Sequence, residues 1–284
     1  MPETKNLSPA EKWEQLTFAD DFIFCKVLEK NLDFTKELLE LLLNIQIERV
    51  ELSSAQKDCK SNYLSKGARF DVYVKDGTGR CFDIEIQTSH FSDLSKRARY
   101  YQAVMDVDSL QPGENYSNLK DSYVIFLCLG DPIGTGLPVY TFHHRADEDF
   151  DFLMKDGTTT VFFNAKQYDK METLERRSFF EYLCKQKTDS ACHSAFTDKL
   201  STLVERVKTS PQERKNYMMF EEIVRKRAKE EREEALEEGE QKKALETAKN
   251  MLINNISLEM VAKCTGLPLE QVLALQKEIC VTLC

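Results

Sequence analysis

The sequence predicts an α/β fold, in which a mixed central sheet is flanked by helices, followed by an α-helical C-terminal extension. Two observations predict it. Helical and strand-like periodicities alternate over residues 13–208, and 18 of the 30 residues in 221–250 are charged. The first pattern is typical of layered α/β domains, and the second of a solvated helix. We therefore expect one domain over 12–210 and a charged helix with a helix-turn-helix-like tail over 211–284.

The first third of the chain predicts two helices and a β-hairpin. Apolar residues recur at helical spacing from Trp13 to Leu43, with a break near residues 31–33 that separates two helices. Over 46–59 the pattern weakens, and no element is predicted there. Polar and apolar residues alternate over 69–74 and 81–87, and the Asp76-Gly77 turn signal lies between them. This spacing predicts two antiparallel strands.

The rest of the domain predicts further helices and a buried strand. A helix is expected over 92–110, because a Gln-Pro-Gly sequence follows it. The continuous apolar run over 122–129 indicates a central strand buried on both faces. Two more strands are expected over 138–143 and 159–163, and a helical pattern returns over 168–208. Residues 257–279 fit both a helix-turn-helix and a generic helical hairpin.

The net charge first argues against a nucleic-acid partner. The chain holds 39 Lys and Arg against 48 Asp and Glu, a net charge of −9, whereas phosphate binding requires a basic surface. Residues 61–120, however, hold eight basic and eight acidic residues, so this stretch is neutral. The acidity lies elsewhere on the chain, which predicts weak or salt-sensitive DNA affinity.

Compartment and membrane topology follow from the cysteines and the apolar runs. No apolar run near the start approaches the roughly 20 residues that a bilayer span needs, and the N-terminus has no secretory pattern. The nine cysteines are scattered, without CxxC spacing. We therefore expect a cytoplasmic protein with free thiols and no membrane partner.

The hairpin is the most informative stretch for chemistry. With a period of two along a strand, Asp83, Glu85 and Gln87 share one face, opposite the apolar face. Asp71 on the neighbouring strand falls on the same, exposed face. Like charges that close repel each other unless a divalent cation lies between them, and oxygen ligands suit Mg²⁺ or Mn²⁺. An ordinary amphipathic hairpin with a solvated face explains the same pattern.

A family resemblance adds to this pattern. Asp71, followed by Glu85-Ile86-Gln87 on the next strand, resembles the split PD-(D/E)xK nuclease motif, with Gln in place of the usual Lys. Four flanking segments strengthen the resemblance: residues 21–26, 69–72, 99–101 and 113–119. Together they resemble the bacterial recombination-promoting nucleases, also described as PD-(D/E)xK nuclease family transposases, over about residues 17–170. Two departures are Phe70, where the motif has Pro, and Cys25, where relatives usually have Lys.

The resemblance implies a metal-dependent DNA endonuclease with a restriction-endonuclease-like core. Asp71, Glu85 and the carbonyl of Ile86 would hold Mg²⁺ or Mn²⁺, and Gln87 would orient the attacking water and touch the scissile phosphate. Asp21 is a further candidate acid, although a helix N-cap role explains either it or the adjacent Asp20.

Phosphate contacts and partners follow from the same resemblance. Three basic residues of the following helix are candidate phosphate contacts, although a solvated helix face explains them equally well: Lys96, Arg97 and Arg99. The partner is then DNA, and a homodimer through the helical tail is expected because a double-strand cut needs two sites. The competing hypothesis is a non-catalytic DNA-binding or assembly protein that acts through the C-terminal tail.

Overall fold

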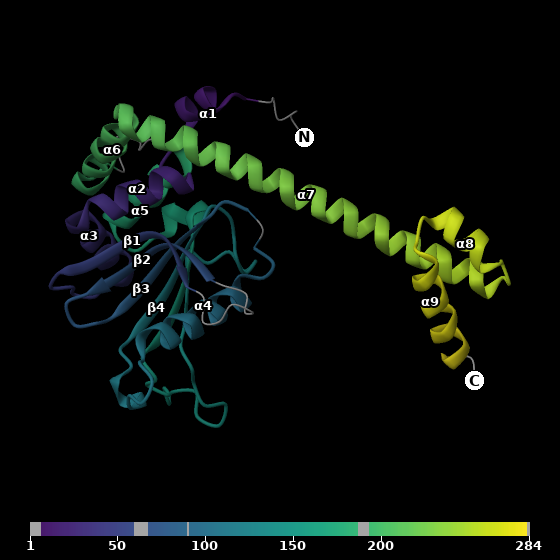
Figure 1. The fold of residues 1–284 in the computed structure, drawn as a ribbon. Helices are drawn as coiled ribbons and strands as arrows, with labels where there is room; N and C mark the ends of the chain where they lie inside the picture. Colours follow the sequence, from purple (N-terminus) through teal and green to yellow (C-terminus); the bar gives the residue numbers. More distant parts are fainter. Residues whose placement is uncertain (1–6, 60–67, 90, 187–192, 283–284) are drawn as a thin grey trace. The chain divides into compact units, whose positions relative to one another are not determined.

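The computed structural model describes residues 7–59, 68–89, 91–186 and 193–282 (Figure 1). The chain divides into two compact units, Met1–Tyr217 and Met218–Cys284. The sequence-based boundary at 210/211 coincides with the start of helix α7, Pro211–Ile253, whereas the division between the units falls seven residues later, within that helix.

The first unit is built on a mixed six-stranded sheet, which confirms the predicted α/β fold. Its spatial order is β1-β2-β3-β4-β6-β5. Strands β3, β4 and β6 run parallel to one another, whereas β1, β2 and β5 each run antiparallel to a neighbour. The strands are β1 (Val50–Cys59), β2 (Ala68–Asp76), β3 (Cys81–Gln87), β4 (Ser122–Cys128), β5 (Val139–Phe142) and β6 (Thr158–Asn164).

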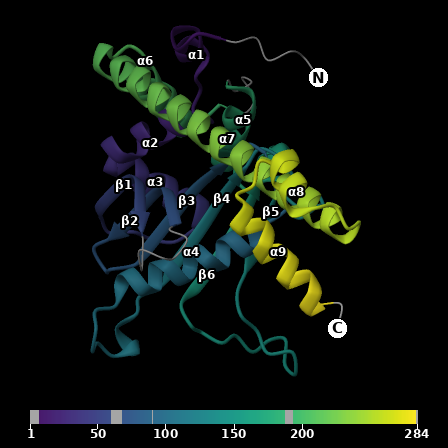
Figure 2. The same ribbon diagram turned by 45° about the vertical axis from the view of Figure 1, so that its right-hand side comes forward.

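Helices cover both faces of this sheet (Figures 1 and 2). On one face α2 (Asp21–Lys30) and α3 (Leu32–Leu43) pack on β1, with α5 (Leu174–Lys185) and α6 (Ala195–Lys208) against them. On the other face α4 (Leu94–Ser109) packs on β2 and β4. The short elements are α1 (Pro9–Gln15), η1 (Tyr116–Asn118) and η2 (Ala165–Lys170).

The predicted helices near the N-terminus are correct except in their first boundary. The break near residue 31 is confirmed, since α2 ends at Lys30 and α3 begins at Leu32. Residues 16–20, however, form a connection, and the fully buried Phe18 lies in it and not in a helix. A capping box between Ser8 and Glu11 starts the preceding helix, which the periodicity alone did not separate.

Strand β1 was missed by the sequence prediction. It pairs with β2 along most of its length, from Val50 opposite Asp76 to Cys59 opposite Ala68. Its residues are largely polar, because an edge strand takes its main-chain hydrogen bonds from one neighbour and needs no alternating apolar pattern. The hairpin β2–β3, the central strand β4 and strands β5 and β6 agree with the prediction.

The polar face of the hairpin is buried, which corrects the expectation that it faces solvent. Asp83 is 0% exposed and Glu85 2% exposed. Helix α4 provides the cover, because Leu94, Ala98 and Met105 form one apolar cluster with side chains of β2, β3, β4 and β6. Period-two alternation shows which residues share a face, but not whether another element covers that face.

Five cysteines are free thiols, in agreement with the prediction: Cys25, Cys81, Cys128, Cys184 and Cys264. Cys192 and Cys284 lie outside the described residues. Among the helices that the structure describes, none combines the length and the apolar character that crossing a bilayer requires.

The second unit has an apolar core of its own. Helix α8 (Leu258–Thr265) ends at Gly266, whose φ of 73° permits the left-handed cap, and α9 (Leu269–Thr282) follows. The cluster joins both helices to the end of α7 through Ala248, Leu252, Val261, Leu267, Val272 and Leu275. The predicted order of helix, Gly-containing turn and helix is confirmed.

Candidate active site

A polar cavity of about 230 Å³ lies at the carboxyl end of β3. Its lining residues come from α2, β2, β3 with the residue that follows it, and α4: Asp21, Asp71, Glu85, Ile86, Gln87, Thr88, Arg97 and Tyr101. The structure therefore brings together six of the predicted site residues: Asp21, Asp71, Glu85, Ile86, Gln87 and Arg97. Lys96 and Arg99 are exposed on α4 and do not line this cavity.

Asp71 and Glu85 are fixed by hydrogen bonds to each other's strand. The backbone N–H of Asp71 donates to Oε1 of Glu85 at 2.9 Å. In return, the backbone N–H of Ile86 donates to Oδ2 of Asp71 at 3.1 Å. Antiparallel pairing of β2 with β3 creates this exchange, because Val72 lies opposite Ile84 and the two acids are the next residues beyond that pair.

Burial makes these carboxylates costly to ionise. Burial, together with the charge of Glu85, raises the pKa of Asp71 to about 8. Burial also raises the pKa of Glu85, although hydrogen bonding from the Asp71 N–H and the charge of Arg97 act against it. A site whose acids resist ionisation in this way gains most from a cation that compensates their charge.

Asp83 is the deepest carboxyl of the group. Neither of its oxygens receives a hydrogen bond from an N–H or hydroxyl of the described residues, and the Glu85 carboxyl is close enough to share a proton with it. Burial and the neighbouring Glu85 charge raise the pKa of Asp83 well above its usual range. Asp83 does not line the cavity, whereas Asp21, Asp71 and Glu85 do.

Arg97 connects α4 to both acidic and amide groups of β3. Its Nη1 donates to Oε1 of Gln87 at 2.9 Å, and its Nη2 donates to Oε2 of Glu85 at 3.1 Å. A longer contact of 3.4 Å joins Nη2 to the Tyr101 hydroxyl. Tyr101 is not among the site residues predicted from the sequence. Its spacing of four residues from Arg97, which sets both on one helix face, is the signal that would have found it.

The structure separates the roles of Asp20 and Asp21. Asp20 occupies the N-cap position of α2, and its carboxylate accepts hydrogen bonds from the backbone and hydroxyl of Thr17 at 2.7 and 2.8 Å. Asp21 lies in the first turn and lines the cavity, where its charge adds to the rise in the pKa of Asp71. Of the two adjacent acids, Asp21 is therefore the one at the site.

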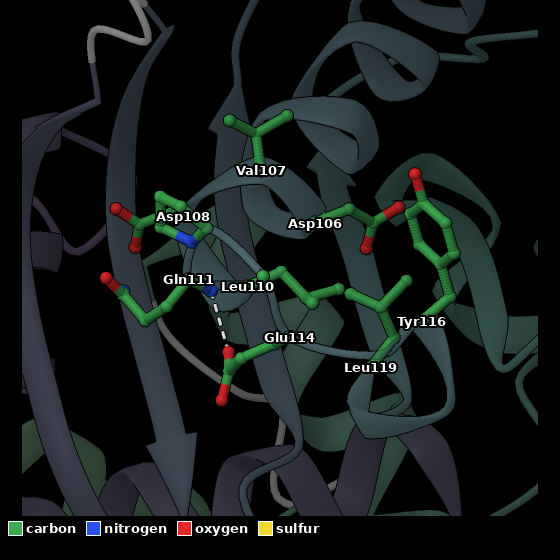
Figure 3. A pocket seen from close by; sticks show the side chains of 10 residues that line it. Asp106, Val107, Asp108, Leu110, Gln111, Glu114, Tyr116 and Leu119 are labelled. Carbon is green, nitrogen blue, oxygen red and sulfur yellow. Dashed lines mark hydrogen bonds between the residues drawn. The ribbon is translucent and has the colours of Figure 1, made fainter.

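Two larger cavities flank α4 and have different linings. One of about 590 Å³ includes Arg99, Gln102 and Phe162 among its lining residues. The other, of about 670 Å³, follows the end of α4, where Asp106, Asp108 and Glu114 contribute carboxylates (Figure 3). Glu114 accepts a hydrogen bond there from the backbone of Gln111. Three carboxylates repel phosphate, so this cavity does not suit a nucleic acid.

The residues of the polar cavity fit a divalent cation. Asp71, Glu85 and the Ile86 carbonyl are oxygen donors, and Mg²⁺ takes one or two carboxylates while keeping several waters. No group of three or more His, Cys, Asp or Glu side chains is poised to hold a metal among the described residues. Asp71, Glu85 and the Ile86 carbonyl nevertheless match the small set of protein oxygens that a divalent cation with several bound waters requires.

A comparison with known protein families identifies one family. The family described as PD-(D/E)XK nuclease family transposase matches residues 19–249. No curated protein and no solved structure matches the chain. The match covers most of the chain, including the whole sheet and every residue that lines the cavity. The chain therefore belongs to the PD-(D/E)XK nuclease family transposases.

Proposed function

We propose that the protein is a metal-dependent DNA endonuclease that hydrolyses phosphodiester bonds and promotes recombination or acts on mobile DNA. One observation carries the proposal. Asp71 and Glu85 are held together by reciprocal main-chain hydrogen bonds in a polar cavity that Arg97 also lines. Two acids and a cation in one cavity suit phosphoryl chemistry, in which a water is activated and negative charge develops on phosphate.

Asp71, Glu85 and the Ile86 carbonyl would hold Mg²⁺ or Mn²⁺, and Asp21 would add a further carboxylate at the rim. When bound, the ion polarises a phosphoryl oxygen and lowers the pKa of a water. The chain's own residues do the rest. The hydrogen bonds to Asp71 and Glu85 keep both carboxylates oriented before substrate arrives, and the Gln87 amide lines the same cavity.

DNA would approach across α4. Lys96 and Arg99 are exposed on this helix, and Arg97 reaches the cavity. These three basic side chains would contact successive phosphates of the DNA. Because the stretch around them is neutral overall, binding should be weak and should fall steeply with salt. A double-strand cut would need two such sites, which favours a homodimer through the helical tail.

Cleavage of supercoiled plasmid tests the proposal. The wild-type protein should nick or linearise plasmid with Mg²⁺ or Mn²⁺, and EDTA should stop it. Glu85→Ala and Asp71→Asn should fall to background. Glu213→Gln is the matched control, because Glu213 is also buried and ion-paired, to Lys30, but lies outside the cavity. Undiminished cleavage by Glu85→Ala would overturn the assignment.

The second unit favours one other candidate function. The hairpin of α8 and α9 packs on the end of α7 through its own apolar core, as a small helix-turn-helix does. In this alternative the chain is a non-catalytic DNA-binding or assembly protein that acts through the tail. Intact plasmid at every Mg²⁺ and Mn²⁺ concentration, together with DNA binding that needs residues 221–284, would support it.

A further inference from the structure

The cavity lacks the charged side chain that a lysine in the motif would supply. Gln87 stands at that position, and an amide carries no charge. Both of its polar groups already have partners in the protein, since Oε1 accepts from Arg97 at 2.9 Å and Nε2 donates to the Ser89 carbonyl. The amide therefore holds two neighbouring groups, one of which is the Arg97 guanidinium.

Arg97 brings a permanent positive charge to the same point. Its guanidinium keeps its proton at any physiological pH, and three of its five N–H donors make the contacts with Gln87, Glu85 and Tyr101. The side chain is 30% exposed, so an anion in the cavity can reach it. The positive charge is the property that Gln87 lacks.

Packing holds the guanidinium in one orientation. Its central carbon lies 5.5 Å from the ring centre of Tyr101 and 5.4 Å from that of Phe126, distances at which a cation is attracted to an aromatic ring. Phe126 is fully buried in β4, and α4 is fixed to the sheet through Leu94 and Ala98. A donor that is oriented before the reaction stabilises developing charge without a cost of reorganisation.

We propose that Arg97 is a catalytic residue that stabilises the charge of the transition state in place of the motif lysine. Gln87 and Tyr101 are positioning residues that hold its guanidinium. This inference rests on the proposed nuclease function, and it replaces the direct substrate contact first assigned to Gln87. The N–H donors of Arg97 that these contacts leave open can donate to a non-bridging oxygen of a phosphate.

The reaction balances without a proton from Arg97. The oxygen of a water forms a bond to phosphorus, and its proton passes to solvent. The bond between phosphorus and the leaving deoxyribose oxygen breaks, and that oxygen takes a proton from solvent. Arg97 donates hydrogen bonds to the phosphoryl oxygens throughout and stays charged, so its contribution is electrostatic.

A double-mutant cycle tests the two roles. With plasmid and Mg²⁺, Arg97→Ala should lower kcat by about 100- to 1,000-fold, and Gln87→Ala by about 10- to 100-fold with little change in KM. If Gln87 acts by holding Arg97, the double variant should be no slower than Arg97→Ala alone. If the losses in kcat of the two single variants multiply in the double variant, Gln87 touches substrate directly and its positioning role is wrong.

Restoring the positive charge from β3 tests the role of Arg97. In the Arg97→Ala background, Gln87→Lys should recover at least about tenfold of the lost rate, because it returns a cation to the cavity. Arg176→Ala is the matched control. Arg176 is also a half-buried arginine, whose guanidinium binds the carbonyls of Leu41 and Leu42 away from the cavity. Arg97→Ala with wild-type kcat would overturn the inference.

A binding measurement separates this inference from the proposed function. With CaCl₂ and a labelled double-stranded oligonucleotide, Arg97→Ala should bind more weakly, and the slope of log affinity against log salt should fall by about 1. Melting curves confirm that each variant is folded. If the wild type fails to cleave, the nuclease function is wrong. If it cleaves but Arg97→Ala keeps its kcat, affinity and salt slope, only the role of Arg97 is wrong.

Discussion

The backbone nitrogen of Asp71 donates a 2.9 Å hydrogen bond to Glu85, so the main chain of one acid orients the side chain of the other. The second bond, from Ile86 to the Asp71 carboxylate, completes the exchange at 3.1 Å. Neither side chain can turn away without breaking a contact to the neighbouring strand. A substitution of either acid should therefore change the orientation of both carboxylates.

The stability of the metal-free protein should fall as pH rises from 5 to 8. The pKa of Asp71 is raised to about 8 and that of Glu85 is also raised, so the folded state binds more protons than the unfolded state in this window. Stability therefore declines with pH, by at most about 1.4 kcal/mol per pH unit for each carboxyl. Melting temperatures in EDTA measure the effect.

Two comparisons check the origin of that pH dependence. MgCl₂ should raise the melting temperature more at pH 8 than at pH 5, because the ion binds the ionised carboxylates. Asp71→Asn should make the profile in EDTA less steep, since it removes one of the carboxyls that take up a proton. A wild-type melting temperature in EDTA that stays constant or rises between pH 5 and 8 would contradict the assignment of the raised pKa values.

Asp83→Asn should stabilise the metal-free protein at pH 8. Asp83 is fully buried and neither oxygen receives a hydrogen bond from an N–H or hydroxyl of the described residues, so ionising it is costly. The amide has the same shape, carries no charge and can donate to Glu85. We expect a gain of about 1–3 kcal/mol in the free energy of unfolding, measured by urea denaturation.

Asp76→Asn is the matched control and should have the opposite effect. Asp76 is equally buried, but its carboxylate accepts hydrogen bonds from Thr78 and Arg80. Burial raises the pKa of Asp76, but these hydrogen bonds outweigh burial and lower it. Loss of the Asp76 charge should therefore destabilise the fold. If both Asn variants shifted stability in the same direction, the contrast between the two carboxyls would be wrong.

Gly157→Ala should destabilise the first unit more than Gly113→Ala. Both glycines have positive φ values, 79° and 88°, so either substitution strains the backbone by about 1 kcal/mol. At Gly157 the new Cβ would also lie 2.6 Å from Oδ1 and 3.4 Å from Cα of Asp121, whereas nothing lies within 4 Å at Gly113. Equal urea midpoints for the two variants would exclude the steric contribution.

Deletion of residues 221–284 should leave plasmid cleavage at the wild-type initial rate. The shortened chain keeps every residue that lines the cavity, and it keeps Tyr217, whose ring lies 5.4 Å from that of Trp13 and 5.2 Å from that of Phe22. If the tail mediates a homodimer, light scattering should report a monomer after the deletion. Loss of all DNA binding would instead favour the tail as the functional part.

The sequence was most informative where the signal is local. Asp71, Glu85 and Gln87 were placed on one face because alternation within a hairpin depends only on neighbouring residues, and the family resemblance then assigned their roles. Edge strand β1 was missed because its pairing with β2, and not its own pattern, makes it a strand. The burial of Asp83 was missed because it depends on α4, which packs across the hairpin from a later part of the chain.

The parallel register sets Glu85 opposite Phe126 and Phe126 opposite Phe162 across three strands. The two rings stack at 5.3 Å, and Arg97 lies over the first of them. Phe126, which fills the interior, therefore also supports the guanidinium of Arg97. A substitution of Phe126 or Phe162 should therefore change both the stability of the fold and the position of the Arg97 guanidinium. We expect homologues to exchange these aromatic residues together with the arginine or to keep all of them.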